Sequence, residues 1–246
     1  MRQPSDLVRY PRPSVAVDLA ILTVVRQSGL DELGSLAVLV QEPGPEVQGR
    51  ALPGRFLREG QTVAQAVADV LRVKAGLKDV RPVPRLLRVF DDPGRDPRGW
   101  TLSLAHSLVL PRERLEGARG NLIKVTPAGE LEGGETLLFD HDLIVTEATA
   151  AMRERYEHSP DPDGLLERPF TIAELRGVHE AVIGERLLKD TFRRRMEPQL
   201  QPQTDEDGHP VLRSDGGRPA QVYVRPQERE LNASARRRLL LPRASR

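Results

Sequence analysis

Five side chains in two turn-rich segments have the chemistry to hold a phosphorylated ligand. Guanidinium groups bind phosphate oxygens through paired N–H donors, and an aromatic ring offers a wall for a base. Two of the arginines follow the turn signal Pro53-Gly54, and the other residues lie in or directly after the polar loop DDPGRDPRG. The candidate ligand-binding residues are Arg55, Arg58, Arg95, Arg98 and Trp100. Alternatively, the two loop arginines only solubilise a turn, and the tryptophan belongs to the core.

A second set of basic residues lies on a predicted helix over residues 187–196, LLKDTFRRRM. Helical spacing places Leu188, Phe192 and Met196 on one face and leaves the basic side chains outward. Gly184 separates this helix from an earlier one, and two short helices around a glycine turn are typical of a helix-turn-helix. Together with a basic residue farther along the chain, the candidate DNA-binding residues are Lys189, Thr191, Arg193, Arg194, Arg195 and Arg218.

The segments around this helix support the same interpretation. Thr171 and Glu174 have the spacing of a capping box at the start of the first helix. Residues 211–224 predict a hairpin with its turn at residues 215–217, and Arg218 follows that turn. A basic hairpin after a helix-turn-helix indicates a wing. The alternative is that the arginine run is merely a solvated helix face.

Predicted strands and helices position the candidate ligand-binding residues. Apolar, β-branched runs predict neighbouring strands over 14–25 and 36–41, and further strands over 86–90 and 100–110. Apolar residues at helical spacing predict a helix after the N-cap Thr62, ending at Gly76, and another from the N-cap Asp140 to about Tyr156. Residues 112–134 are expected to be mostly loop. Residues 158–164, HSPDPDG, have the composition of a linker or hinge.

Composition limits the class of protein. The 246 residues include 38% hydrophobic residues and no cysteine, which excludes disulfides and thiolate metal sites. The five histidines do not pair at metal-ligand spacing, so we expect no metal and no cofactor. No apolar run is long enough for a membrane span, so we expect a cytoplasmic protein without membrane contact. Residues 165–246 contain 16 Lys and Arg against 12 Asp and Glu, and this positive balance suggests a nucleic-acid partner.

The stretch LPGRFLREGQTVAQAVADVLRVKAGL, residues 52–77, resembles the Nudix box of Nudix hydrolases in its loop–helix frame. The scaffold positions of the box are kept at Gly54, Leu71, Gly76 and Leu77. The first glycine of the pattern falls on Arg55 and its first glutamate on Gln61, its Arg-Glu pair on Asp69-Val70 and its Glu-Glu pair on Val73-Lys74. Mg²⁺ needs hard oxygen ligands, which valine and lysine cannot supply. The resemblance therefore implies a Nudix domain without catalytic residues.

The whole chain resembles the Nudix-related transcriptional regulators of NAD metabolism. The matching stretches are LPGRFLREG, FDDPGRDPRGW, LLFDHDLI, FTIAELRGVHEAVIGERLLKDTFRRRM and GGRPAQVYV. The resemblance implies an α/β protein, with an α/β/α Nudix-like sandwich around a mixed sheet over residues 1–160 and a degenerate box at 54–77. A small α+β winged helix-turn-helix domain is expected over 165–226, followed by a basic tail over 227–246.

The leading hypothesis is a ligand-responsive regulator, a repressor that acts as a homodimer on a double-stranded DNA operator. The resemblance implies ADP-ribose or a related nucleotide or sugar phosphate as its effector. One alternative is a Nudix pyrophosphohydrolase with a displaced metal site at Glu59, Asp69 and the pair Asp91-Asp92. The other is an adaptor whose winged domain binds protein instead of DNA.

Overall fold

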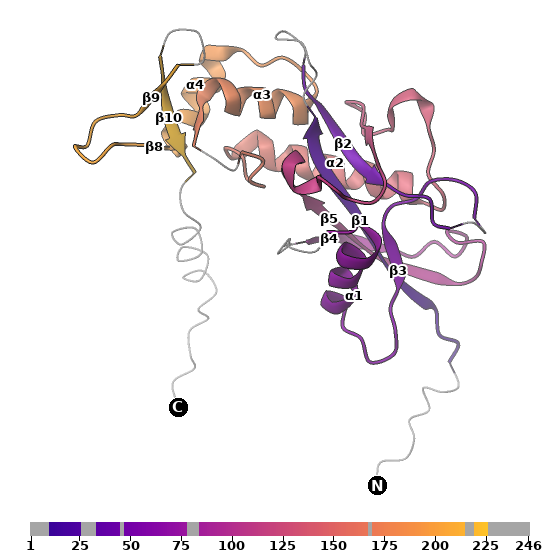
Figure 1. Ribbon diagram of the computed structural model, residues 1–246. Helices are drawn as coiled ribbons and strands as arrows, with labels where there is room; N and C mark the ends of the chain where they lie inside the picture. Colours follow the sequence, from indigo (N-terminus) through magenta and orange to yellow (C-terminus); the bar gives the residue numbers. More distant parts are fainter. Residues whose placement is uncertain are drawn as a thin grey trace, which may run out of the picture.

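The computed structural model describes residues 10–25, 33–44, 47–77, 84–166, 169–214 and 219–225. It consists of a sheet with helices on both faces, joined to a smaller module of two helices and short strands (Figure 1). The predicted residue Arg218 and the predicted tail over 227–246 lie outside the described residues. Within the described part, no helix combines the length and the apolar content that a membrane span requires.

The larger module contains six strands and two α-helices. Its sheet has the order β4-β5-β1-β2-β6, with β3 paired to β1; the β1–β5 pair is parallel and the other pairs are antiparallel. The elements are β1 Ser14–Val25, β2 Ser35–Val40, β3 Gly54–Phe56, α1 Val63–Asp69, a π-helical turn Val70–Lys74, β4 Arg85–Phe90, β5 Thr101–Val109, β6 Asn121–Lys124 and α2 His141–His158, with short 3-10 turns at Arg112–Leu115 and Glu132–Gly134. The mixed sheet confirms the predicted α/β class.

Alternation along β1 explains why both faces of the sheet are covered. Val17, Leu19 and Ile21 are buried against α1, whereas Ala20 and Leu22 are buried in the core that contains α2. A strand that is apolar on both faces requires a layer on each side. The predicted α/β/α sandwich follows from this pattern.

Local signals placed most helix ends correctly. Thr62 accepts a hydrogen bond from the backbone N–H of Gln65, whose side chain in turn accepts from the N–H of Thr62. Gly76 ends this region with a φ of 74°, a conformation that favours glycine. Asp140 is the N-cap of α2, as predicted, but its side chain makes no capping bond and is held by Arg95.

One further expectation was incomplete and another was wrong. Residues 112–134 are mostly turns and loop, as expected, but they also contain β6, which pairs with β2. Four residues are too few to show the alternation that identifies a strand. Leu188 is not on the buried face of its helix: it precedes the helix with extended backbone angles, and 78% of it is exposed.

The smaller module contains β7 Phe170–Thr171, α3 Ile172–Ile183, α4 Lys189–Met196, a 3-10 turn Glu197–Gln199, β8 Gln201–Pro202, β9 Leu212–Arg213 and β10 Ala220–Val224. The predicted capping box of Thr171 and Glu174 is present at the start of α3. Gly184 ends α3 with a φ of 88°. The predicted hairpin is present as the antiparallel pair β9–β10, and its turn lies outside the described residues.

The two modules share a core at α3. Val178 and Val182 of α3 are buried in the cluster that contains α2 and the sheet. The guanidinium of Arg153, on α2, donates to the carbonyl of Val182 at 2.9 Å and to that of Thr126 at 3.1 Å. Helix α3 therefore belongs structurally to both modules.

The segment predicted as a linker or hinge is packed instead of exposed. Asp161 has no exposed surface, and its carboxylate accepts from the backbone N–H groups of Leu165 at 2.7 Å and Leu166 at 3.0 Å. A buried polar group held by several bonds resists local opening. Beside it, the ring of His179 contacts those of Tyr156 and Phe192, with centroids 4.9 and 5.0 Å away.

Candidate functional site

A cavity of about 350 Å³ opens where β1 and β3, the loop before β5 and the start of α2 meet. Three of the five predicted ligand residues, Arg55, Arg95 and Arg98, line it. Arg58 and Trp100 are not among its lining residues, and the tryptophan is half exposed directly before β5. Three of the five predicted residues therefore contribute guanidinium groups to one cavity.

The floor of the cavity is a buried polar network around Asp18. Its carboxylate accepts from the hydroxyl of Ser103 at 2.6 Å and lies 3.5 Å from Nε2 of His141. The backbone N–H of Leu52 donates to Nδ1 of His141, so the ring proton lies on Nε2 and faces Asp18. Burial raises the pKa of Asp18, but the bonds from His141 and Ser103 and the charge of Arg95 outweigh it and hold that pKa below its ordinary value.

Gly54 fits closely over this network. A Cβ at Gly54 would lie 2.0 Å from Oδ1 of Asp18, so any other residue would collide with the carboxylate. The glycine at position 54 and the buried acid therefore depend on each other sterically. Asp18 is the single charged residue of its strand, and that isolation in an apolar run was a signal that we missed.

Arg95 is buried among acidic partners. Its side chain is 3% exposed, and its Nε and Nη2 atoms donate to the two carboxylate oxygens of Asp140 at 2.8 and 2.5 Å. Asp18 lies 3.6 Å from the same guanidinium. Arg95 thus fastens the loop before β5 to the start of α2, and few of its donors are left for a ligand.

Arg98 forms a platform with two aromatic rings. Asp96 accepts from its Nε at 2.9 Å and its Nη2 at 2.7 Å, and these bonds lower the pKa of Asp96. The guanidinium carbon lies 5.3 Å from the ring centre of Phe56 and 4.7 Å from that of Phe139. Phe139 has a φ of 62°, an uncommon backbone conformation for a bulky residue and one that is often found at binding sites. Neither phenylalanine was predicted.

The predicted DNA-binding residues of α4 are all exposed, but they differ in their partners. Arg193 makes a two-pronged ion pair with Glu197, and Arg195 approaches Nδ1 of His158 at 3.3 Å. Within the described part of the chain, no hydrogen bond or ion pair holds the side chains of Lys189, Thr191 and Arg194. These three are the side chains of the helix most available for a partner.

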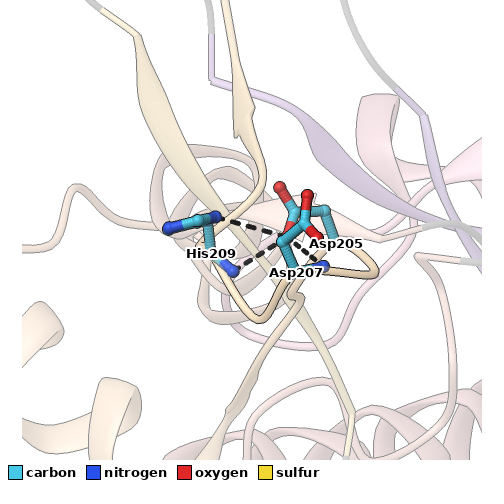
Figure 2. Close-up of side chains that lie close together, drawn as sticks. All are labelled: Asp205, Asp207 and His209. Atoms are coloured by element: carbon cyan, nitrogen blue, oxygen red, sulfur yellow. Dashed lines mark hydrogen bonds and ion pairs between the residues drawn. The ribbon is translucent and has the colours of Figure 1, made fainter.

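The loop between β8 and β9 brings three exposed side chains together, Asp205, Asp207 and His209 (Figure 2). Asp205 accepts from the backbone N–H groups of Asp207 at 3.1 Å and His209 at 2.8 Å. The turn itself explains why these side chains converge, so we assign no ligand to them.

Comparisons with known proteins agree with both modules. The family described as the NrtR DNA-binding winged helix domain matches residues 164–224. The ADPR responsive transcriptional repressor NtrR of Acinetobacter baylyi is 27% identical over 224 residues, 87% of this chain and 82% of that protein. The ADP-ribose pyrophosphatase of Methanocaldococcus jannaschii is 31% identical over 137 residues, 55% of this chain and 73% of that protein. The structure of Shewanella oneidensis NrtR complexed with a 27mer DNA matches with a TM-score of 0.66 and 25% identity, over 87% of this chain and 94% of that one.

Proposed function

Because the chain belongs to the Nudix-related transcriptional regulators with an NrtR-type winged helix, we propose that it is an operator-binding repressor whose sensor cavity binds ADP-ribose or a related phosphorylated nucleotide. We expect such a DNA-binding protein in the cytoplasm, together with the DNA. One observation carries the proposal: α2 begins at the cavity with His141 and ends at the DNA-reading helix, where His158 meets Arg195.

The DNA-binding role belongs to the exposed face of α4. Lys189, Thr191 and Arg194 project from a helix whose opposite side, Phe192 and Met196, is buried in the core of the smaller module. In a helix-turn-helix the second helix enters the major groove, where basic and hydroxyl side chains contact phosphates and base edges. As the family resemblance implies, we propose that the protein acts as a homodimer, whose two copies place these helices about 34–36 Å apart to read successive turns of DNA.

Effector binding belongs to the cavity. A phosphorylated nucleotide offers a diphosphate for guanidinium groups and a planar base for an aromatic platform. The cavity has Arg55 on one wall and the platform of Arg98, Phe56 and Phe139 on another. The relatives named for ADP-ribose make this nucleotide the first effector to test.

A pyrophosphohydrolase is the second candidate, because one relative is named for that activity. The acids of a displaced metal site do not converge in the described structure. Asp69 is held by Arg55, Gln61 and Arg72, whereas Asp91 and Asp92 line a separate hollow of about 430 Å³. We therefore favour a regulator that binds its nucleotide without cleaving it.

The test is to titrate DNA from the gene's own upstream region at fixed salt, with and without saturating ADP-ribose. We expect a protected operator and an affinity reduced about 5- to 150-fold by the nucleotide, the usual range of coupling between two sites. By linkage, operator DNA must weaken ADP-ribose binding by the same factor. Unchanged operator affinity, with nucleotide binding measured separately, would refute ADP-ribose as the effector. No protection at all would favour the adaptor hypothesis.

A further inference from the structure

We propose that Arg55 takes the place of a divalent cation in this Nudix frame: its guanidinium binds the diphosphate of the effector, and binding needs no Mg²⁺. The inference rests on the proposed function, since it concerns the same cavity. It names the residue that binds the effector, the group of the effector that is bound, and the independence of binding from Mg²⁺. Each of these can be measured.

The donor set does not fit Mg²⁺. This ion binds carboxylate and other hard oxygens, usually together with substrate phosphates. At the positions where a Nudix box has its glutamates, this chain has Gln61, Val70, Val73 and Lys74. An amide, two hydrocarbon side chains and an ammonium group form no cation site.

The remaining carboxylate of this helix is already neutralised. Asp69 accepts from Nη1 of Arg55 at 2.6 Å, from Nε2 of Gln61 at 2.9 Å and from Nη2 of Arg72 at 3.0 Å. Two guanidinium groups beside one acid leave a positive excess. A divalent cation approaching Asp69 would meet both of these positive charges.

Arg55 is placed to direct that positive charge into the cavity. Its side chain is 14% exposed and lines the cavity, whereas its partner Asp69 does not. Its backbone is fixed in β3, where Arg55 pairs with Val17 of β1. The acid therefore anchors the guanidinium from behind, and such preorganised cations bind anions at little entropic cost.

Arg55 also keeps more of its donors than the other cavity arginines. Arg95 and Arg98 each use two nitrogens on one carboxylate. Arg55 uses only Nη1, and within the described residues its Nε and Nη2 have no hydrogen-bond partner. These two nitrogens form the fork that a phosphate group requires.

Lys74 adds a second positive charge to the same wall. It is exposed and lines the cavity, and its ammonium group has no ion-pair partner in the described part of the chain. It occupies a position where the Nudix box has a glutamate. The cavity thus has cations at positions where a hydrolase would have metal-binding acids.

The experiment measures binding of ADP-ribose, and of inorganic pyrophosphate as a second probe, to the full-length protein by calorimetry in Mg²⁺ and in EDTA. We expect equal affinities in the two buffers. Arg55→Gln should weaken both probes about 10- to 100-fold, the range for a lost charge-assisted bond. Arg55→Lys should recover part of that loss. Arg72→Gln is the matched control: it removes a positive charge from the same Asp69, yet Arg72 does not line the cavity, so the loss should stay below about threefold.

The outcomes separate the inference from the proposed function. Binding that requires Mg²⁺, or equal losses in the Arg55→Gln and Arg72→Gln variants, overturns the inference and leaves a nucleotide sensor intact. Binding of pyrophosphate through Arg55 without any binding of ADP-ribose supports the inference and removes ADP-ribose as the effector. If the wild type binds neither probe, the inference fails. Thermal unfolding of each variant identifies a loss of binding that is due to misfolding, and Arg55→Lys, which keeps the pair with Asp69, then provides the deciding comparison.

Discussion

The hydroxyl of Tyr156 donates to the carboxylate of Asp161 at 3.1 Å, inside the corner where α2 meets the smaller module. Both side chains are fully buried. Asp161 has a φ of 43°, an unfavourable backbone angle that persists only where surrounding contacts hold the residue in place. The guanidinium of Arg225, beyond the last strand of the smaller module, lies 3.6 Å from the same carboxylate. The corner therefore joins the segment after α2 to the distant residue Arg225 and is unlike a free hinge.

Replacing Asp161 by alanine should destabilise the protein by about 3 kcal/mol. The change removes the acceptor of two backbone N–H groups and of the Tyr156 hydroxyl, and buried donors left without a partner are costly. Urea unfolding measures this loss. Glu157→Ala, which removes an exposed carboxylate from the last turn of α2, should change the free energy of unfolding by less than about 0.5 kcal/mol. Equal effects of the two changes would contradict the role of the corner.

Acid should weaken this corner through His179. Burial lowers the pKa of His179 to about 4, while the unfolded chain keeps the ordinary value near 6.5. The unfolded state therefore takes up a proton first as the pH falls. The stability contributed by neutral His179 is fully present above pH 6.5 and is lost progressively from pH 6.5 to about 4; the loss reaches about 2 kcal/mol at pH 5.

The pH prediction is tested by unfolding wild type and His179→Gln between pH 7 and pH 4. Glutamine can still accept from the backbone N–H of Asp161, but it does not titrate. The groups that face His179 include Tyr156, Asp161 and Arg195, and burial raises the pKa of Asp161. The difference between the two pH profiles isolates the imidazole from these neighbours. Parallel profiles would refute the assignment.

Among the three arginines of α4, Arg194 should matter most for DNA. Arg193 is already paired with Glu197 and Arg195 approaches His158, so Arg194 is the most available. Arg194→Ala should weaken operator binding by ~1–3 kcal/mol, at one base position if it reads a base and across all sequences if it contacts phosphate. In the second case the slope of log affinity against log salt falls by about one.

Arg193→Ala serves as the comparison within the same helix and should weaken operator binding less than Arg194→Ala. Fluorescence anisotropy at several salt concentrations measures both variants. A triple alanine variant of Arg193, Arg194 and Arg195 that binds the operator like wild type would show that α4 is not the reading helix.

Incubation with ADP-ribose and Mg²⁺ should release no AMP. The reason is chemical: the glutamate positions of the box have Gln61, Val70, Val73 and Lys74, and Asp69 is paired with guanidinium groups. Chromatography of the reaction detects AMP, with a Nudix hydrolase as the positive control. Mg²⁺-dependent turnover on the order of one per second, a typical enzymatic rate, would restore the hydrolase hypothesis.

The sequence predicted those features that depend on neighbours along the chain. The N-cap at Thr62, the capping box at Thr171 and the glycine at position 184 mark helix ends through local bonds, and they were found as expected. The buried contacts of the cavity join residues that are far apart: Arg95 meets Asp140, and Ser103 meets Asp18. Periodicity indicates that a side chain is outward or inward, but not which acid it will meet. Three of the predicted arginines therefore line one cavity, but the sequence did not indicate that Arg95 and Arg98 already donate to carboxylates.

Helix α2 also fixes a rotational relationship between its two ends. It has 18 residues, which at about 1.5 Å of rise per residue makes a rod roughly 27 Å long. Each residue turns such a rod by about 100°, so inserting a single residue in its middle would rotate His158 to another side while His141 kept its place in the cavity wall. An insertion of about seven residues, close to two full turns, would restore the facing but lengthen the rod by roughly 10 Å. A change of one residue in the length of α2 would therefore break the alignment between the cavity at His141 and the contact of His158 with α4.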